Sequence, residues 1–187
     1  TGAAVEWLRE GLGLIKSALE TDELASSTGD NGGVYVVPAF SGLGAPHWDQ
    51  YVRGIISGLT RGTTRAHIVR AVLESIAYQT ADIVDTMKSD SGYTIKTLRV
   101  DGGVSKNEFL MQFQADILDV PVHRIKNVEA TARGAAMLAG LGSGIWKDLD
   151  FDGMDEGTLF EPNMSDSERK RLKEGWRSAL GKALFHC

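Results

Sequence analysis

The fold of this chain is decided by the stretch Leu98-Arg99-Val100-Asp101-Gly102-Gly103-Val104-Ser105-Lys106-Asn107-Glu108, which reads as a strand end, a glycine turn and a helix start. Gly102 and Gly103 have no Cβ, so the backbone can turn sharply and lie against a ligand. Ser105 followed by Glu108 is a capping-box pattern, which predicts a helix N-terminus just after the glycines. The stretch therefore predicts a tight βα turn.

Such a turn can bind an anion. Unpaired N–H groups and the positive end of the helix dipole favour phosphate at a helix start. Asn107, in the first turn, offers an amide donor and an acceptor suited to a nucleobase edge or a ribose. An ordinary βα turn with a helix cap explains the same residues without a ligand. The choice between a ligand-binding turn and an ordinary one therefore depends on the flanking sequence.

Outside this stretch, helical and extended patterns alternate. Hydrophobic periodicity predicts helices over residues 3–19, 64–88, 105–118, 130–141 and 165–185. Apolar and β-branched runs predict strands or extended segments at residues 34–37, 53–59, 95–100 and 121–125. Residues 20–33 read as a polar loop, and residues 147–163 as acidic and rich in turns. The order strand, helix, strand, helix predicts an α/β fold with a parallel sheet flanked by helices.

Composition excludes several classes of protein. The 187 residues are 42% hydrophobic and 24% charged, as expected of one globular domain, or one domain with a tail. The net charge of −5 and the lack of a basic patch argue against nucleic-acid binding. The single cysteine, Cys187, favours a reducing compartment, and no apolar run predicts a membrane span. The chain opens on Thr1 without an initiator Met, so we expect a piece of a longer protein.

Residues that could perform catalysis are scarce. The four histidines lack metal-ligand spacing, and we expect surface or capping roles for them, His67 at a helix start among these. The carboxylates between Asp148 and Glu156 read as a solvated loop. No Gly-x-Ser-x-Gly elbow or Walker-type loop occurs. The residues alone therefore predict an α/β domain that could bind a nucleotide but has no catalytic base or nucleophile of its own.

Several motifs together resemble a known family. The pattern Gly54-x-Ile56-x-Gly58-Leu59, then His67-Ile68, then Ala71-Val72-Leu73-Glu74 resembles the second signature of the FGGY carbohydrate kinases. Three further stretches resemble, more narrowly, the glycerol kinase subfamily: residues 34–49, residues 73–80, and residues 98–103 with 107–114. The similarity extends from Gly2 to about Trp176, which is nearly the whole chain.

The resemblance implies an α/β kinase of the actin and hexokinase-like superfamily, whose two ribonuclease-H-like halves close over ATP. This chain resembles the later part of the second half: a mixed sheet flanked by helices, incomplete at its N-terminal end. We expect residues 1–146 to form this partial nucleotide-binding domain. Residues 147–187 would add an acidic loop and a helix packed on the same domain.

The resemblance also implies site residues. Gly103 and Asn107, with Gly102, would line the ATP or ADP site, and Gly2 and Glu6 would lie near it. Many family members carry Gln at the position of Glu6. The small-residue helix over 130–141 would help to wall the pocket. No catalytic residue and no metal ligand is implied within this chain, because the aspartate base belongs to the other half.

The implied activity is transfer of the γ-phosphoryl group of ATP to glycerol, with Mg²⁺ neutralising charge. Glycerol or a related polyol would be bound mainly by the N-terminal domain, in a cytoplasmic, homo-oligomeric enzyme. Two alternatives stay open: another FGGY kinase acting on xylulose, ribulose or gluconate, and a non-catalytic, nucleotide-responsive interaction domain. The stretch 162–171 departs from the one with which bacterial relatives bind a phosphotransferase protein, so that partner is not implied.

Overall fold

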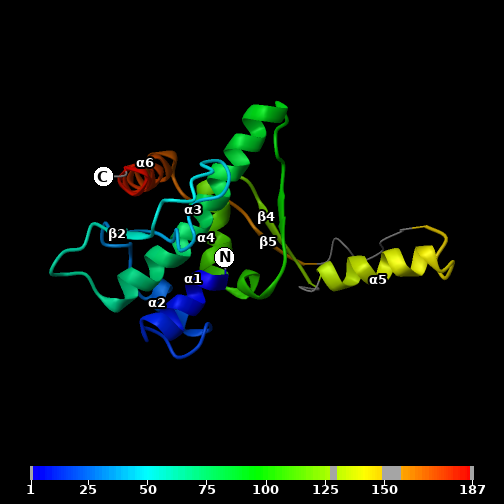
Figure 1. The fold of residues 1–187 in the computed structure, drawn as a ribbon, viewed down its shortest axis with the longest axis horizontal. Helices are drawn as coiled ribbons and strands as arrows, with labels where there is room; N and C mark the ends of the chain where they lie inside the picture. The colour runs from blue at the N-terminus through cyan, green and yellow to red at the C-terminus, as the bar shows by residue number, and fades with distance from the viewer. Residues whose placement is uncertain (1, 127–129, 149–156, 186–187) are drawn as a thin grey trace.

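The computed structural model describes residues 2–126, 130–148 and 157–185, and the long helix α3 (Arg65–Ser91) runs through its middle (Figure 1). Thr64 and His67 cap its start reciprocally: Thr64 Oγ1 accepts from the His67 N–H, and His67 Nδ1 accepts from the Thr64 N–H. Gly92, at φ +70°, ends it in the left-handed region that suits glycine. The helix predicted over 64–88 is confirmed, and so is the capping role of His67.

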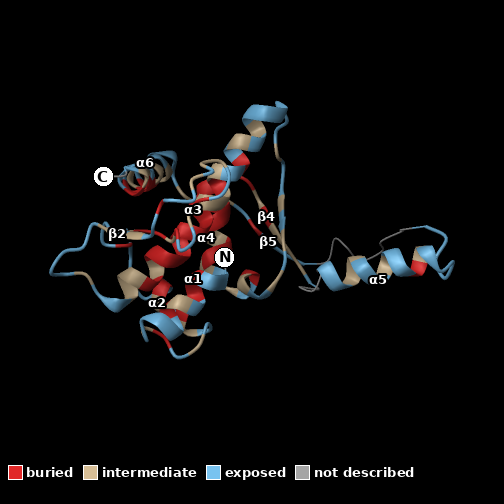
Figure 2. Ribbon diagram, viewed as in Figure 1, coloured by how far each residue is buried: buried red, intermediate tan, exposed pale blue. Residues whose placement is uncertain are grey.

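The middle of α3 is buried on all sides. Residues 71–78 are all buried, because α2 (Glu20–Ser26), α4 (Glu108–Leu118) and the strand β1 (Tyr35–Val37) pack around them. Figure 2 shows the buried residues concentrated in α3 and α4. The C-terminal part of α3 is open to solvent instead, with Ile83 and Met87 42% and 56% exposed. The apolar side chains of α3 are therefore buried only as far as about residue 84.

The strands form two small sheets. β1 (Tyr35–Val37) pairs antiparallel with β2 (Ile55–Ser57). β3 (Leu98–Val100) pairs parallel with β4 (Val122–Ile125), as predicted, and β5 (Gly157–Phe160) adds an antiparallel edge to β4. The sequence did not predict β5, because the residues around it are acidic and it has no strand pattern of its own. It forms a strand by pairing with β4.

The N-terminal helix is shorter than predicted. α1 (Gly2–Glu6) continues as a π-helical turn (Trp7–Gly11), and the helix then stops, with Gly13 at φ +62°. The prediction of one helix over 3–19 is therefore wrong, because Gly11 and Gly13 weaken the helix where it would have to continue. Within the predicted polar loop lies α2 instead, whose first residue, Glu20, accepts hydrogen bonds from the N–H groups of Lys16 and Ser17.

The last helix, α6 (Asp166–Leu184), begins at Ser165 as predicted, with the Ser165 hydroxyl accepting from the Glu168 N–H. It packs on α3, α4, β1 and β2. Trp176 is 2% exposed, stacks on Tyr78 with ring centroids 5.2 Å apart, and donates from its indole N–H to Asp82 at 2.8 Å. Among the four tryptophans, Trp176 is thus a core anchor, whereas Trp48 is 80% exposed.

Helix α5 (Ala130–Gly142) forms over the predicted residues but extends away from the other helices (Figure 1). Its C-terminal end folds back locally, since Trp146 packs where a Cβ on Gly140 would stand. The acidic residues of 149–156, together with His186 and Cys187, lie outside the described residues. No helix in the described part of the chain is both long and apolar enough to cross a membrane.

Candidate functional site

The glycine turn borders a cavity of about 450 Å³. Four parts of the chain line it: the first helical turns, the start of α2 with the segment before it, the middle of α3, and the turn between β3 and α4. The lining residues are Gly2, Val5, Glu6, Arg9, Ala18, Leu19, Thr21, Asp22, Leu73, Gly103, Val104, Lys106 and Asn107. A volume of this size lies within the range of small-molecule sites.

Four of the five site residues expected from the resemblance lie on this one cavity. Gly2 and Glu6 reach it from α1, and Gly103 and Asn107 from the turn about a hundred residues later. Gly102 is not among the lining residues, although it shapes the turn: its φ of +87° and ψ of 172° are a conformation that suits glycine. The structure brings these residues together, and their contact with a nucleotide remains a prediction.

The helix after the turn begins later than predicted. Gly103–Lys106 forms a short 3₁₀ helix, and α4 starts at Glu108 with Asn107 as its cap. Asn107 Oδ1 accepts from the Leu110 N–H at 2.7 Å. The predicted capping box is therefore wrong: the Ser105 hydroxyl donates to the Gly102 carbonyl, and the Glu108 carboxylate pairs with Arg124 at 2.8 Å. The 3₁₀ turn shifts the start of the helix by three residues.

The positive end of α4 is occupied by the protein itself. Asp22 Oδ1 accepts from the Phe109 N–H at 2.7 Å, and Asn107 Nδ2 donates to Thr21 Oγ1 at 3.0 Å. The expectation of unpaired N–H groups waiting for a phosphate at this helix start is therefore only partly met. Arg9 and Lys106 also line the cavity with cationic side chains, although Arg9 pairs with Glu10 at 2.8 Å. The carboxylates of Glu6 and Asp22 line the same cavity.

Thr21 and Asp22 are the site residues that sequence reasoning missed. They lie in a segment without clear periodicity, which reads as part of a polar loop. Thr21 is 2% exposed, and its hydroxyl also donates to the Ala18 carbonyl at 2.6 Å. The only local signal was the cluster of Glu20, Asp22 and Glu23, which is typical of the first turn of a helix.

The cap predicts a measurable loss of stability. We expect Asn107→Ala to lower the free energy of unfolding by about 1 kcal/mol, because the Leu110 N–H loses its acceptor. Urea unfolding measures this change. The control is Asn107→Asp, which retains the acceptor but loses the donor to Thr21, and should unfold close to the wild type. Equal losses for both variants would show that the link to Thr21, and not the cap, provides the stability.

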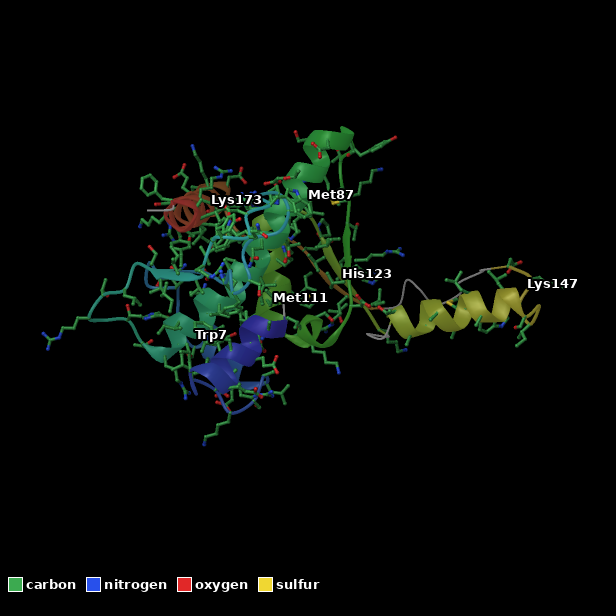
Figure 3. The ribbon with its side chains drawn as sticks, viewed as in Figure 1. Trp7, Met87, Met111, His123, Lys147 and Lys173 are labelled. Atoms are coloured by element: carbon green, nitrogen blue, oxygen red, sulfur yellow. The ribbon has the colours of Figure 1, made fainter. Side chains whose placement is uncertain are left out.

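Helix α5 does not line the cavity, contrary to expectation. Lys147, labelled in Figure 3, lies just beyond the outer end of α5, on the opposite side of the view from Trp7. Small residues along one helix face permit close packing but do not determine against which element the helix packs. The described residues contain no group of three or more His, Cys, Asp or Glu side chains that could hold a metal ion.

The fold is that of the actin and hexokinase-like kinases. It matches the crystal structure of Plasmodium falciparum glycerol kinase with ADP, with a TM-score of 0.88 at 39% identity, over 100% of this chain and 37% of that one. A ligand-bound xylulose kinase from Lactobacillus acidophilus shares the fold, with a TM-score of 0.78 at 22% identity over 97% of this chain and 37% of that one. The profile of the FGGY family of carbohydrate kinases, C-terminal domain, matches residues 1–143, and the chain belongs to this family.

The relatives of this chain include several glycerol kinases. It is 59% identical to glycerol kinase 2 of Thermotoga maritima, over 98% of this chain and 38% of that relative. It is 55% identical to glycerol kinase 2 of Sulfolobus acidocaldarius, over 98% of this chain and 37% of the relative. The chain thus spans little more than a third of the length of these relatives, and corresponds to their C-terminal part. The family and fold class expected from the motifs are confirmed.

Proposed function

We propose that this chain forms the nucleotide-binding part of an ATP-dependent glycerol kinase, which converts ATP and glycerol to ADP and glycerol 3-phosphate. The observation that carries the proposal is the cavity on which Gly2, Glu6, Gly103 and Asn107 meet. These are the residues for which the family resemblance implies nucleotide contact. The similar glycerol kinase of Plasmodium falciparum, described with ADP, supports the same ligand class.

The choice of glycerol rests on the comparisons. Identity is 55–59% to curated glycerol kinases but 22–26% to four solved xylulose and gluconate kinases of the same fold. The acceptor hydroxyl would be bound mainly by the rest of the longer protein, together with the carboxylate base. The homo-oligomeric state, the cytoplasmic location and the boundary between residues 1–146 and 147–187 stay predictions.

The residues of this chain would contribute position and charge. In-line phosphoryl transfer requires the γ-phosphorus and the attacking oxygen to be held in reactive geometry. Gly103 lets the backbone approach the nucleotide, and Arg9 and Lys106 would offset phosphate charge. Mg²⁺ would enter with the ATP phosphates, as it usually does, and neutralise charge there.

The test is a substrate panel on the full-length protein. With ATP and Mg²⁺, we expect kcat/KM for glycerol to exceed that for xylulose, ribulose and gluconate by at least about tenfold. A preference for one of the sugars would replace glycerol as the substrate. Calorimetric binding of ADP with no turnover on any of the four would favour a nucleotide-responsive interaction domain instead.

A further inference from the structure

A partly buried arginine joins three elements behind the cavity. Arg70, on α3, has a side chain only 14% exposed. Its Nε donates to Glu74 Oε1 at 2.8 Å. Its Nη1 donates to the carbonyl of Ala25, in the last turn of α2, at 3.4 Å, and to that of Thr28, just beyond the end of α2. Its guanidinium also lies over the Phe109 ring of α4, 4.9 Å from the centroid. Arg70 thereby ties α2 and α4 to α3.

Glu74 fixes this arginine in place. Its side chain is 2% exposed and accepts from Asn31 Nδ2 at 2.8 Å and from the Tyr78 hydroxyl at 3.4 Å, in addition to Arg70. Burial raises the pKa of the Glu74 carboxyl above its ordinary value, and the hydrogen bonds from Arg70 and its other partners oppose that shift. A buried carboxylate with three donors has little freedom to move, so the direction of the Arg70 side chain is fixed as well.

The N-terminal end of α2 forms part of the cavity wall. Thr21 and Asp22 line the cavity, and both bind the start of α4, through Asn107 Nδ2 and the Phe109 N–H. Arg70 and Glu74 are not lining residues themselves, although Leu73 between them is. One end of this seven-residue helix is therefore held by Arg70, while the other holds the turn from which Gly103 and Asn107 reach the cavity.

We propose that Arg70 and Glu74 are positioning residues for the nucleotide site, acting through α2 on Asn107 and the start of α4. The inference rests on the proposed function, because it assigns the same cavity to the nucleotide. Its physical basis is the forked guanidinium, which donates to the Glu74 carboxylate and to two backbone carbonyls at once. A lysine ammonium at this position could not reach all three acceptors.

A purely structural role predicts a different outcome. Buried ion pairs often contribute little net stability, because desolvation offsets their attraction, while removal of one partner is costly. If the pair only stabilises the core, variants should lower the melting temperature and leave the affinity for nucleotide unchanged. If it positions α2, nucleotide affinity should fall selectively and the KM for glycerol should not.

Arg169 offers a matched control at the other end of α4. Its side chain is 13% exposed, and it pairs with Asp119 at 2.9 Å and donates from Nε to the Asp116 carbonyl at 2.6 Å. It therefore ties α6 to α4 much as Arg70 ties α2, and it lies outside the set of cavity residues. Arg169→Met removes a comparable set of contacts without touching α2.

The experiment compares full-length wild type, Arg70→Met, Arg70→Lys and Arg169→Met. We expect Arg70→Met to raise the Kd for ADP and the KM for ATP about tenfold, which equals about 1.4 kcal/mol. The KM for glycerol should stay within about twofold, and Arg70→Lys should recover part of the ADP affinity, since it keeps one donor beside Glu74. Arg169→Met should lower the melting temperature but leave the Kd for ADP within about twofold of the wild type.

Hydrogen exchange provides a second readout. The amide of Phe109 and those of α2 should exchange faster in both Arg70 variants, because the Asp22 acceptor is no longer held in place. If Arg70→Met fails to fold, Arg70→Lys tests the positioning role by itself. The expected result is then a raised Kd for ADP and faster hydrogen exchange at Phe109 and in α2.

The outcomes separate this inference from the proposed function. Wild-type ADP affinity in the Arg70 variants, or an equal loss in Arg169→Met, would contradict the positioning role. A wild-type protein that binds no ADP would overturn the proposed function and the inference together. Binding that Gly103→Val disrupts and Arg70→Met leaves intact would overturn the inference alone.

Discussion

Gly103→Val in the full-length protein is expected to weaken ADP binding on the order of a hundredfold, which is about 2.8 kcal/mol at 1.4 kcal/mol per tenfold change. Gly103 lines the cavity, and a Cβ built on it meets no heavy atom within 4 Å. Its φ is not positive, so valine fits the backbone. The branched side chain would instead occupy space that the nucleotide requires, as in other overpacked sites. Calorimetric titration of ADP measures the loss.

The neighbouring glycine provides the control. Gly102 has a φ of +87°, so Gly102→Val should be costly to the fold, whereas Gly103→Val should melt close to the wild type. Loss of ADP affinity at Gly103 without loss of stability would therefore report the ligand and not misfolding. If Gly103→Val binds ADP as the wild type does, the nucleotide does not occupy this cavity.

Elements with local signals could be predicted from the sequence. Helices α3 and α6 carry their own caps at Thr64 and Ser165, and each is several turns long, so short-range pattern and hydrogen bonding agree. The parallel pair of β3 and β4 followed from the order of strand and helix. In each case the residues that determine the type and the bounds of the helix or strand lie within it or next to it in the chain.

Elements that depend on distant partners could not be predicted. The helix α2 binds through Thr21 and Asp22 to residues 86 and 87 positions later in the chain, and β5 exists by pairing with β4. The N-cap of α4 is Asn107 and not Ser105, because a 3₁₀ turn over Gly103–Lys106 separates β3 from α4. No hydrophobic periodicity in the sequence indicates any of these contacts.

The candidate site was predicted by resemblance and not by spacing. Nothing in the residues alone places Gly2 and Glu6 beside Gly103, because about a hundred residues separate them. The resemblance to the family predicted that these residues lie close together, and the structure places Gly2, Glu6 and Gly103 on one cavity. The resemblance failed for α5, whose small residues do not reach the cavity here. The motifs therefore predicted which residues lie together on the cavity, while the contact of these residues with a nucleotide stays a prediction.

The 187-residue polypeptide, expressed alone, is expected to show no glycerol kinase activity. Phosphoryl transfer needs both reactants in near-attack geometry, and the effective molarity that positioning supplies is of order 10⁵–10⁸ M. The chain covers 38% of the length of its Thermotoga maritima relative, and the proposed acceptor pocket lies outside it. Turnover should therefore fall at least about 10⁴-fold below that of the full-length protein. The assay detects glycerol 3-phosphate after incubation with ATP, Mg²⁺ and glycerol.

The same polypeptide should self-associate. Leu19 is 82% exposed and lines the cavity of about 450 Å³, while Phe40 and Ile56, 43% and 36% exposed, line a second hollow of about 400 Å³ beside β1 and β2. Exposed apolar surface of this kind favours association in a chain without its covering partner. Light scattering should show larger particles than for the full-length protein at equal concentration. If the polypeptide stays monomeric and binds ADP weakly, the cavity is complete within this chain. If its kinase turnover lies within about tenfold of that of the full-length protein, the acceptor site lies within these 187 residues as well.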